Sequence, residues 1–110
     1  MNERKRRIGE NEAIFRSVNE QVSSLHATLA TATDTMTVVC ECGARSCTDR
    51  FLIEPARYAE VRDDSTLFVL KPGHDLPEAE MVVAKRDVYW IVRKDPGVPA
   101  AIARATDPRT

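Results

Sequence analysis

The sequence contains no apolar run approaching the ~20 residues that a membrane-spanning helix needs. Its apolar stretches, such as LFVL at 67–70 and MVVA at 81–84, are far shorter. The first residues, MNERKRRIGENEA, are charged and lack the apolar segment of a secretory signal peptide. We therefore expect a cytoplasmic protein that does not enter a membrane.

An excess of charge of either sign is also missing. Lys and Arg number 16 against 17 for Asp and Glu, which leaves a net charge of -1 and no overall attraction to nucleic acid or anionic lipid. The one basic cluster, at 4–7, is followed by Glu10 and Glu12, and no basic stripe with interleaved aromatic residues accompanies it. We expect a charged, solvated terminus, with nucleic-acid binding as the minor alternative.

Motifs of the common enzyme classes are absent from the chain. It has no Gly-rich phosphate loop, no nucleophile elbow and no H-E-x-x-H sequence. A chain of 110 residues has room for one modest core, and its 43% hydrophobic and 30% charged residues suggest a folded middle with solvated ends. The sequence therefore predicts a small protein that is not an enzyme.

An apolar stripe is present near the N-terminus. Its members follow one another at steps of three and four residues: Phe15, Val18, Val22, Leu25 and Leu29. This spacing predicts an α-helix with one apolar face that begins near Asn11, a candidate N-cap, or, as the alternative, extends back to Ile8. Glu12 and Glu20 are assigned to its polar face. The stripe either packs on the protein's own sheet or contacts a protein partner or a second copy.

The rest of the chain predicts short elements. Small polar residues at Thr31–Thr35 break the helical period and predict a linker. β-Branched runs predict strands at 36–42 and 48–54, a proline-initiated run predicts a helix at 55–62, and a third strand runs from Thr66 into a Pro-Gly turn. Runs at 80–85 and 88–93 predict a hairpin, and residues 95–110 predict a flexible tail.

All the cysteines of the chain lie in the stretch VVCECGARSCTDR, at Cys40, Cys42 and Cys47. In a reducing compartment such crowded thiols more often bind metal than form disulfides, and three cannot all pair within one chain. The spacing from Cys42 to Cys47 is typical of zinc ligands, whereas the C-x-C step is tighter. Because residues i and i+2 of a strand face the same side, Cys40 and Cys42 are expected to converge. Gly43 is expected to let the backbone curl around the ion.

A tetrahedral zinc site requires a fourth ligand. His74 is favoured because it follows the Pro-Gly turn, from which a side chain can be aimed at a neighbouring loop, whereas His26 lies in the predicted helix. The remaining candidates are water and three carboxylates, those of Asp49, Asp75 and Glu41. Zinc is favoured over an iron–sulfur cluster, which typically takes four thiolates, and copper(I) is the other metal that suits soft ligands.

Three segments carry a resemblance: NEAIFRSVNEQV, VVCECGARSCTDRFLIEPARYAEVR and LFVLKPGH. Together they resemble a group of short actinobacterial proteins of uncharacterised function that share a CECG…C…PGH pattern. The likeness covers most of the chain from Asn11 to Arg93. It implies one zinc-binding set made of Cys40, Cys42, Cys47 and His74, and it implies no activity. The hairpin turn of that group is richer in glycine than KRDV is here.

These observations predict an α+β fold with a long N-terminal helix, a small, mainly antiparallel sheet, one short helix and a zinc site that joins them. The predicted organisation is a helical arm and linker at 1–34, a zinc-binding domain at 35–94 and a flexible tail at 95–110. The predicted function is that of a non-enzymatic interaction or regulatory module with structural zinc. The alternatives are a thiol-based redox or zinc sensor and a small metal-dependent enzyme.

Overall fold

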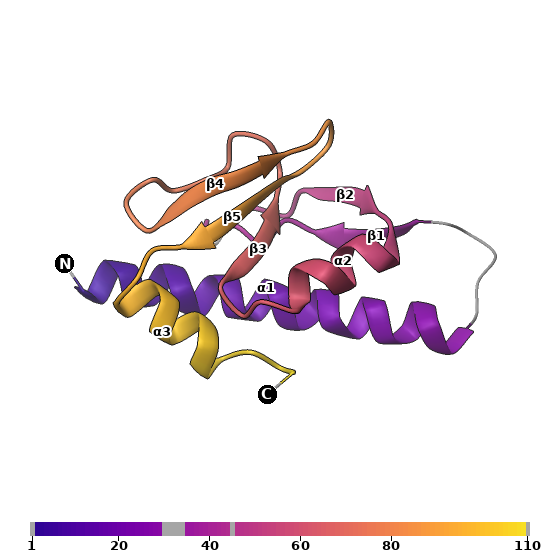
Figure 1. The fold of residues 1–110 in the computed structure, drawn as a ribbon, viewed down its shortest axis with the longest axis horizontal. Helices are drawn as coiled ribbons and strands as arrows, with labels where there is room; N and C mark the ends of the chain where they lie inside the picture. The colour runs from indigo at the N-terminus through magenta and orange to yellow at the C-terminus, as the bar shows by residue number, and fades with distance from the viewer. Residues whose placement is uncertain (1, 30–34, 45, 110) are drawn as a thin grey trace.

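The computed structural model describes residues 2–29, 35–44 and 46–109 of the chain (Figure 1). In chain order the elements are α1 (Asn2–Leu29), β1 (Met36–Val39), β2 (Arg50–Ile53), α2 (Pro55–Arg62), β3 (Leu67–Leu70), β4 (Glu80–Lys85), β5 (Trp90–Lys94) and α3 (Val98–Ala105). The predicted α+β class is confirmed. The predicted linker, Thr31–Thr35, lies outside the described residues except for Thr35.

The strands form two antiparallel sheets, where the sequence suggested one. β1 pairs with β2, and β5 lies between β3 and β4 in the second sheet. The two sheets meet where the chain leaves β1, because the Glu41 amide donates to the Val69 carbonyl over 2.9 Å. The predicted β4–β5 hairpin is confirmed, and its turn closes with the Arg86 amide donating to the Tyr89 carbonyl over 2.9 Å.

The hydrophobic core lies between the sheets and α2. Strand alternation directs every second residue of β1 and β2 inward, whereas most of β3 is buried because the chain covers both of its faces. The main core side chains are Met36, Val38, Phe51, Ile53, Tyr58, Val61, Phe68, Val69, Leu70, Ile91 and Val92. α2 begins with a proline at its first turn and buries Tyr58 and Val61, as its sequence predicted.

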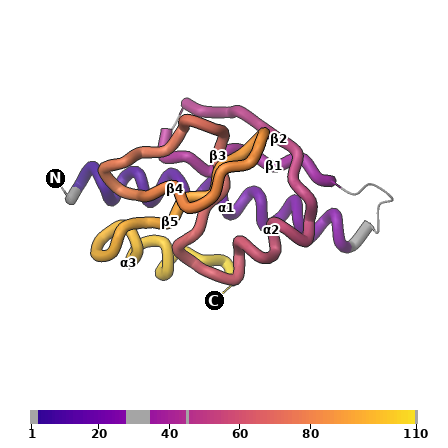
Figure 2. Tube along the Cα trace, turned by 45° about the horizontal axis from the view of Figure 1, so that its top comes forward, coloured from indigo at the N-terminus to yellow at the C-terminus, as the bar shows by residue number. Residues whose placement is uncertain are grey.

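Helix α1 begins at Asn2 and runs along the length of the molecule beneath the sheets (Figures 1 and 2), so the predicted start near Asn11 was wrong. Asn11 does not cap a helix, because its side-chain amide donates to the Gly43 carbonyl over 3.2 Å. Gly9 is tolerated within α1 because α3 packs closely there. A Cβ at Gly9 would lie 2.8 Å from Cγ2 of Ile102.

Apart from Ile8 and Gly9, the fully buried residues of α1 are polar, which the sequence did not predict. Glu12, Arg16 and Asn19 are all 0% exposed. Val18 and Leu25 of the predicted apolar stripe are exposed instead. Assigning Glu12 to the solvated face of the helix was therefore wrong.

The remaining members of the predicted stripe are more buried than Val18 and Leu25, where the structure describes them. Phe15 and Val22 are half-buried, and Val22 packs against the core. The side chain of Leu29 is outside those that the structure describes. The stripe is therefore divided between the core and the surface.

A buried ionic cluster ties α1 to the second sheet. The Lys94 ammonium lies 2.7 Å from a Glu12 carboxylate oxygen and 2.8 Å from a Glu80 oxygen. Burial raises the pKa of Glu12 well above its ordinary value. Burial lowers the pKa of Lys94, but the two carboxylates outweigh it and the pKa is raised overall. Lys94 is therefore the cation that makes burial of this helix face tolerable.

Residues 98–105 form helix α3 within the segment predicted as a flexible tail. α3 buries Pro99, Ala100 and Ala103. Arg16 of α1 donates to the Ala103 carbonyl over 2.7 Å, and its guanidinium lies 4.4 Å from the centre of the Phe68 ring. The sequence did not predict α3, because its apolar face is short and made of small residues. The prolines around it also favoured an irregular segment.

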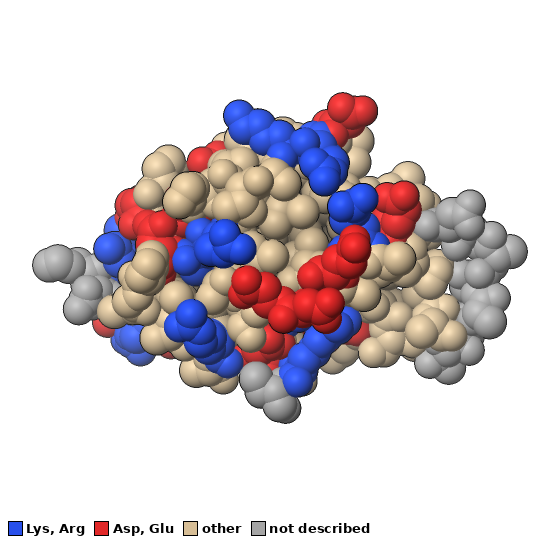
Figure 3. Space-filling view, in the orientation of Figure 1, with Lys and Arg blue, Asp and Glu red and all other residues tan. Residues whose placement is uncertain are grey.

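Charges of both signs are scattered over the face shown in Figure 3, which agrees with the balanced composition. The molecule measures 46 × 29 × 24 Å along its principal axes. Among the residues that the structure describes, no helix is both long and apolar enough to cross a bilayer.

Replacing Lys94 by Ala should lower the free energy of unfolding by about 3–5 kcal/mol, because two buried carboxylates would lose their cation. Urea unfolding measures this change. Lys85→Ala is the control, since Lys85 is exposed on β4 and its loss should cost less than about 1 kcal/mol. Similar losses in both variants would show that the cluster does not hold α1 in place.

Candidate metal centre

The CEC segment directly follows β1 and keeps the alternation of a strand. Cys40 and Cys42 are each 1% exposed and lie on one side of the chain, and Glu41 points to the other. The tight C-x-C step therefore brings two sulfurs together, as the sequence predicted. Cys47 comes from the following loop and is half-buried, and all three cysteines are free thiols.

Glu41 anchors this segment in the protein interior. Its carboxylate is fully buried and accepts hydrogen bonds from the Asn19 amide (2.8 Å), the Tyr58 hydroxyl (2.7 Å) and the Val69 backbone amide (3.1 Å). Burial raises the pKa of this carboxyl group. Because these partners lie on the side away from the thiols, Glu41 is not the fourth ligand.

Asn19 also fixes the strand that leads into the cysteines. Its side-chain amide donates to the Val39 carbonyl over 2.8 Å, and its oxygen accepts from the Val39 amide over 2.8 Å. The side chain thereby replaces a neighbouring strand at the edge of β1. α1 is thus joined directly to the residue before Cys40.

Gly43 is needed for close packing. A Cβ on this residue would lie 2.6 Å from Cγ2 of Ile8 and 3.1 Å from Cδ1 of Leu76. Its backbone does not take the left-handed conformation that favours glycine. Glycine is therefore required at position 43 because the loop lies close to α1, and not, as expected, to let the backbone curl around an ion.

The KPGH turn supplies the histidine. The His74 amide donates to the Lys71 carbonyl over 3.0 Å, and Gly73 has a φ of +83° behind Pro72, as in a type II turn. The Lys71 amide at the start of the same turn donates to the Cys40 sulfur over 3.2 Å. One four-residue turn therefore both presents the imidazole and contacts a thiol.

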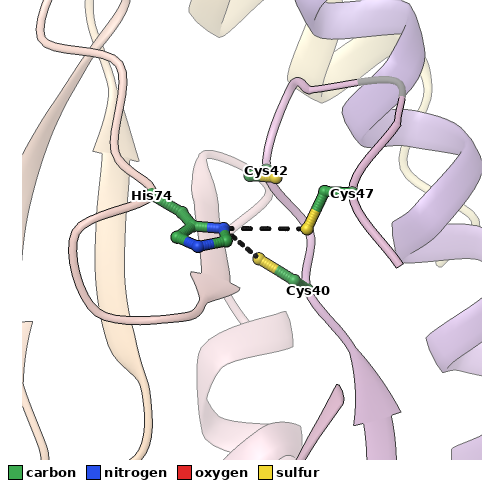
Figure 4. Close-up of side chains that lie close together, drawn as sticks. All are labelled: Cys40, Cys42, Cys47 and His74. Carbon is green, nitrogen blue, oxygen red and sulfur yellow. Dashed lines mark hydrogen bonds between the residues drawn. The ribbon is translucent and has the colours of Figure 1, made fainter. Parts of the chain in front are cut away.

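Figure 4 shows the four predicted ligand side chains converging. His74 Nδ1 lies 3.6 Å from the sulfurs of both Cys40 and Cys47, and all four ligand atoms lie within 4.8 Å of one another. A tetrahedral zinc ion separates a sulfur from a nitrogen ligand by about 3.6 Å and two sulfur ligands by about 3.8 Å. Closure around an ion therefore needs shifts of about an ångström or less.

Backbone amides donate to the sulfurs, but the pKa values of the three thiols shift in different directions. Besides the Lys71 amide on Cys40, the amides of Ala44 and Asp49 bond to Cys42 and Cys47, and each such bond on its own favours a thiolate. The Cys40 thiol donates to Cys42 and, as the largest effect, brings the pKa of Cys42 down to about 5. The same bond, together with burial, raises the pKa of Cys40. Burial likewise raises that of Cys47.

Asp49 lies behind the histidine. Its Oδ2 is 3.6 Å from His74 Nε2, the ring nitrogen that points away from the sulfurs. A carboxylate that hydrogen-bonds the outer nitrogen commonly orients a ligating histidine, and Asp49 lies somewhat beyond that distance. Local sequence does not predict this arrangement, because the approach of Asp49 to His74 depends on how two separate loops pack.

Within the described residues, the cysteines and His74 are the one group of three or more Cys, His, Asp or Glu side chains that could hold an ion. His26 and Asp75, the other fourth-ligand candidates, do not belong to it.

Gly73→Ala should weaken metal affinity, because a Cβ strains the positive φ of the turn that holds His74 and the Lys71 amide. Gly97→Ala is a matched control: Gly97 has a φ of +97°, equally open surroundings and a place at the start of α3. Both variants should lose about 1–3 kcal/mol of stability. Only Gly73→Ala should lose metal to a competing chelator, and equal retention in the two variants would contradict this role of the turn.

No protein-family model, curated protein or solved structure matches this chain. The resemblance to the actinobacterial group therefore stays a prediction. The case for a metal centre rests on the positions and chemistry of the four side chains.

Proposed function

We propose that the protein is a non-enzymatic interaction module whose fold is held by a structural zinc ion bound to Cys40, Cys42, Cys47 and His74. The observation that supports this most strongly is the distance of 3.6 Å from His74 Nδ1 to two sulfurs, which equals the edge of a zinc tetrahedron. A further support is the backbone amides that donate to the three sulfurs.

Zinc suits this ligand set better than the alternatives. It takes mixed sulfur and nitrogen ligands in tetrahedral geometry, whereas an iron–sulfur cluster usually needs four thiolates. Copper(I) also favours sulfur, but three thiolates and one imidazole are a common ligand set of structural zinc. The proposed ion is therefore zinc.

The ion would link the two halves of the molecule. Cys40, Cys42 and Cys47 belong to the connection between β1 and β2, and His74 to the connection between β3 and β4. Structural zinc contributes about 10–16 kcal/mol to folding in zinc-finger peptides, a large amount for so small a core. Zinc would thus fasten the first sheet to the second.

A non-enzymatic role follows from a closed ligand set. Four protein ligands complete a tetrahedron, so no coordination position is left for water or substrate. A sensor role is favoured by the half-exposed Cys47, but Cys40 and Cys42 are buried, which restricts the access of an oxidant. Exposed apolar residues on α1 support binding to a protein partner.

Protein purified without added zinc should contain close to one zinc per chain by elemental analysis. Loss of a residue that only supports a metal ligand typically lowers metal affinity ~10–100-fold. His74→Ala removes a ligand itself, so it should lower zinc affinity by more than this. His26→Ala is the control, as His26 is a half-buried residue of α1 outside the ligand group. Absence of zinc from the wild type, or equal effects of the two substitutions, would sink the proposal.

A further inference from the structure

Between Ile14 and Leu25, helix α1 exposes several apolar side chains and buries charged ones. Ile14, Val18 and Leu25 are 61%, 42% and 60% exposed, whereas Arg16 is fully buried and Glu20 is paired with arginines beneath the helix. A surface helix ordinarily shows water its charges and buries its apolar side chains. This arrangement leaves α1 with a buried polar face that contacts the rest of the protein through ion pairs and hydrogen bonds, and with an apolar face that is exposed to solvent.

The exposed side of this segment carries no charge. It comprises Ile14, Ser17, Val18, Gln21 and Leu25, which we call the uncharged face. These residues span about 100° of the helix circumference and about 17 Å of its axis.

A second copy of this chain fits such a surface. In a two-fold interface each patch meets its own copy, so any charge on it would oppose itself, and an uncharged apolar patch avoids this repulsion. A strongly charged partner would find no opposite charge on the uncharged face. A lipid surface is usually bound by helices with Lys or Arg beside the apolar residues, and none lies among these five positions.

The charge of the rest of α1 favours an antiparallel arrangement. Parallel helices would bring the basic residues 4–7 of the two copies side by side, whereas antiparallel helices separate them and oppose their dipoles favourably. With the two-fold axis between Val18 and Gln21, Ile14 of each copy lies beside Leu25 of the other. A shallow hollow of about 520 Å³ adjoins Leu25 and is lined by Ser17, Glu20, Gln21, Ser24 and Pro108, with Glu20 already paired to Arg109.

We propose that two copies of the protein associate through the uncharged faces of antiparallel α1 helices. This inference rests on the proposed interaction function and names its partner. A contact of this length is at the small end of specific interfaces, so we expect a weak dimer that dissociates on dilution.

Sedimentation equilibrium of the full chain, from low micromolar to submillimolar concentration, tests the proposal. The wild type should pass from monomer to dimer. Ile14→Glu and Leu25→Glu should each weaken association at least about tenfold, because a charge would enter an apolar contact. Met81→Glu is the control, since Met81 is 62% exposed on β4. A wild type that stays monomeric, or single variants that dimerise like Met81→Glu, would overturn the proposal.

The double variant Ile14→Glu with Leu25→Lys tests the arrangement. In antiparallel helices the two new charges attract across the interface, so dimerisation should recover relative to Ile14→Glu alone. In parallel helices like charges would face each other, and a failure to recover would overturn the antiparallel pairing. Zinc is counted in the same samples: zinc-bound monomers would refute only the dimer, and zinc-free dimers would refute only the metal centre.

Discussion

The buried carboxylate of Glu41 is the constraint on which the candidate site depends. Because Asn19, Tyr58 and Val69 all donate to it, the chain between the two buried cysteines is fixed from the opposite side. Strand alternation then leaves the thiols no direction except toward His74. A carboxylate without these donors would be costly to bury, so α1, α2 and β3 must all be in place before the thiols are. The ligand geometry is therefore a property of the whole fold.

Burying polar groups on α1 has a second consequence at the surface. Glu12, Arg16 and Asn19 use one side of the helix to hold β5, α3 and β1, and helical periodicity then turns Ile14, Val18 and Leu25 outward. The buried polar contacts of α1 and its exposed apolar surface therefore have the same origin. In the proposed function, zinc and the buried ion pairs stabilise the fold, and the exposed apolar residues of α1 bind a partner.

The features that the sequence could predict are those encoded by neighbouring residues. The strands followed from β-branched runs, α2 from Pro55, and the approach of His74 to the cysteines from its place after a Pro-Gly turn. The burial of Glu12 and Arg16 could not be predicted, because their partners lie dozens of residues away at Lys94 and Ala103. The same holds for Asp49, whose position behind His74 depends on two separate loops.

X-ray absorption at the zinc edge tests the central claim most directly, because it reports which atoms bind the ion. A site built from Cys40, Cys42, Cys47 and His74 predicts three sulfur neighbours at about 2.3 Å and one nitrogen at about 2.0–2.1 Å. His74→Ala should remove the nitrogen and leave the sulfur signal. A shell of mainly oxygen and nitrogen, or a nitrogen that remains in His74→Ala, would contradict the account.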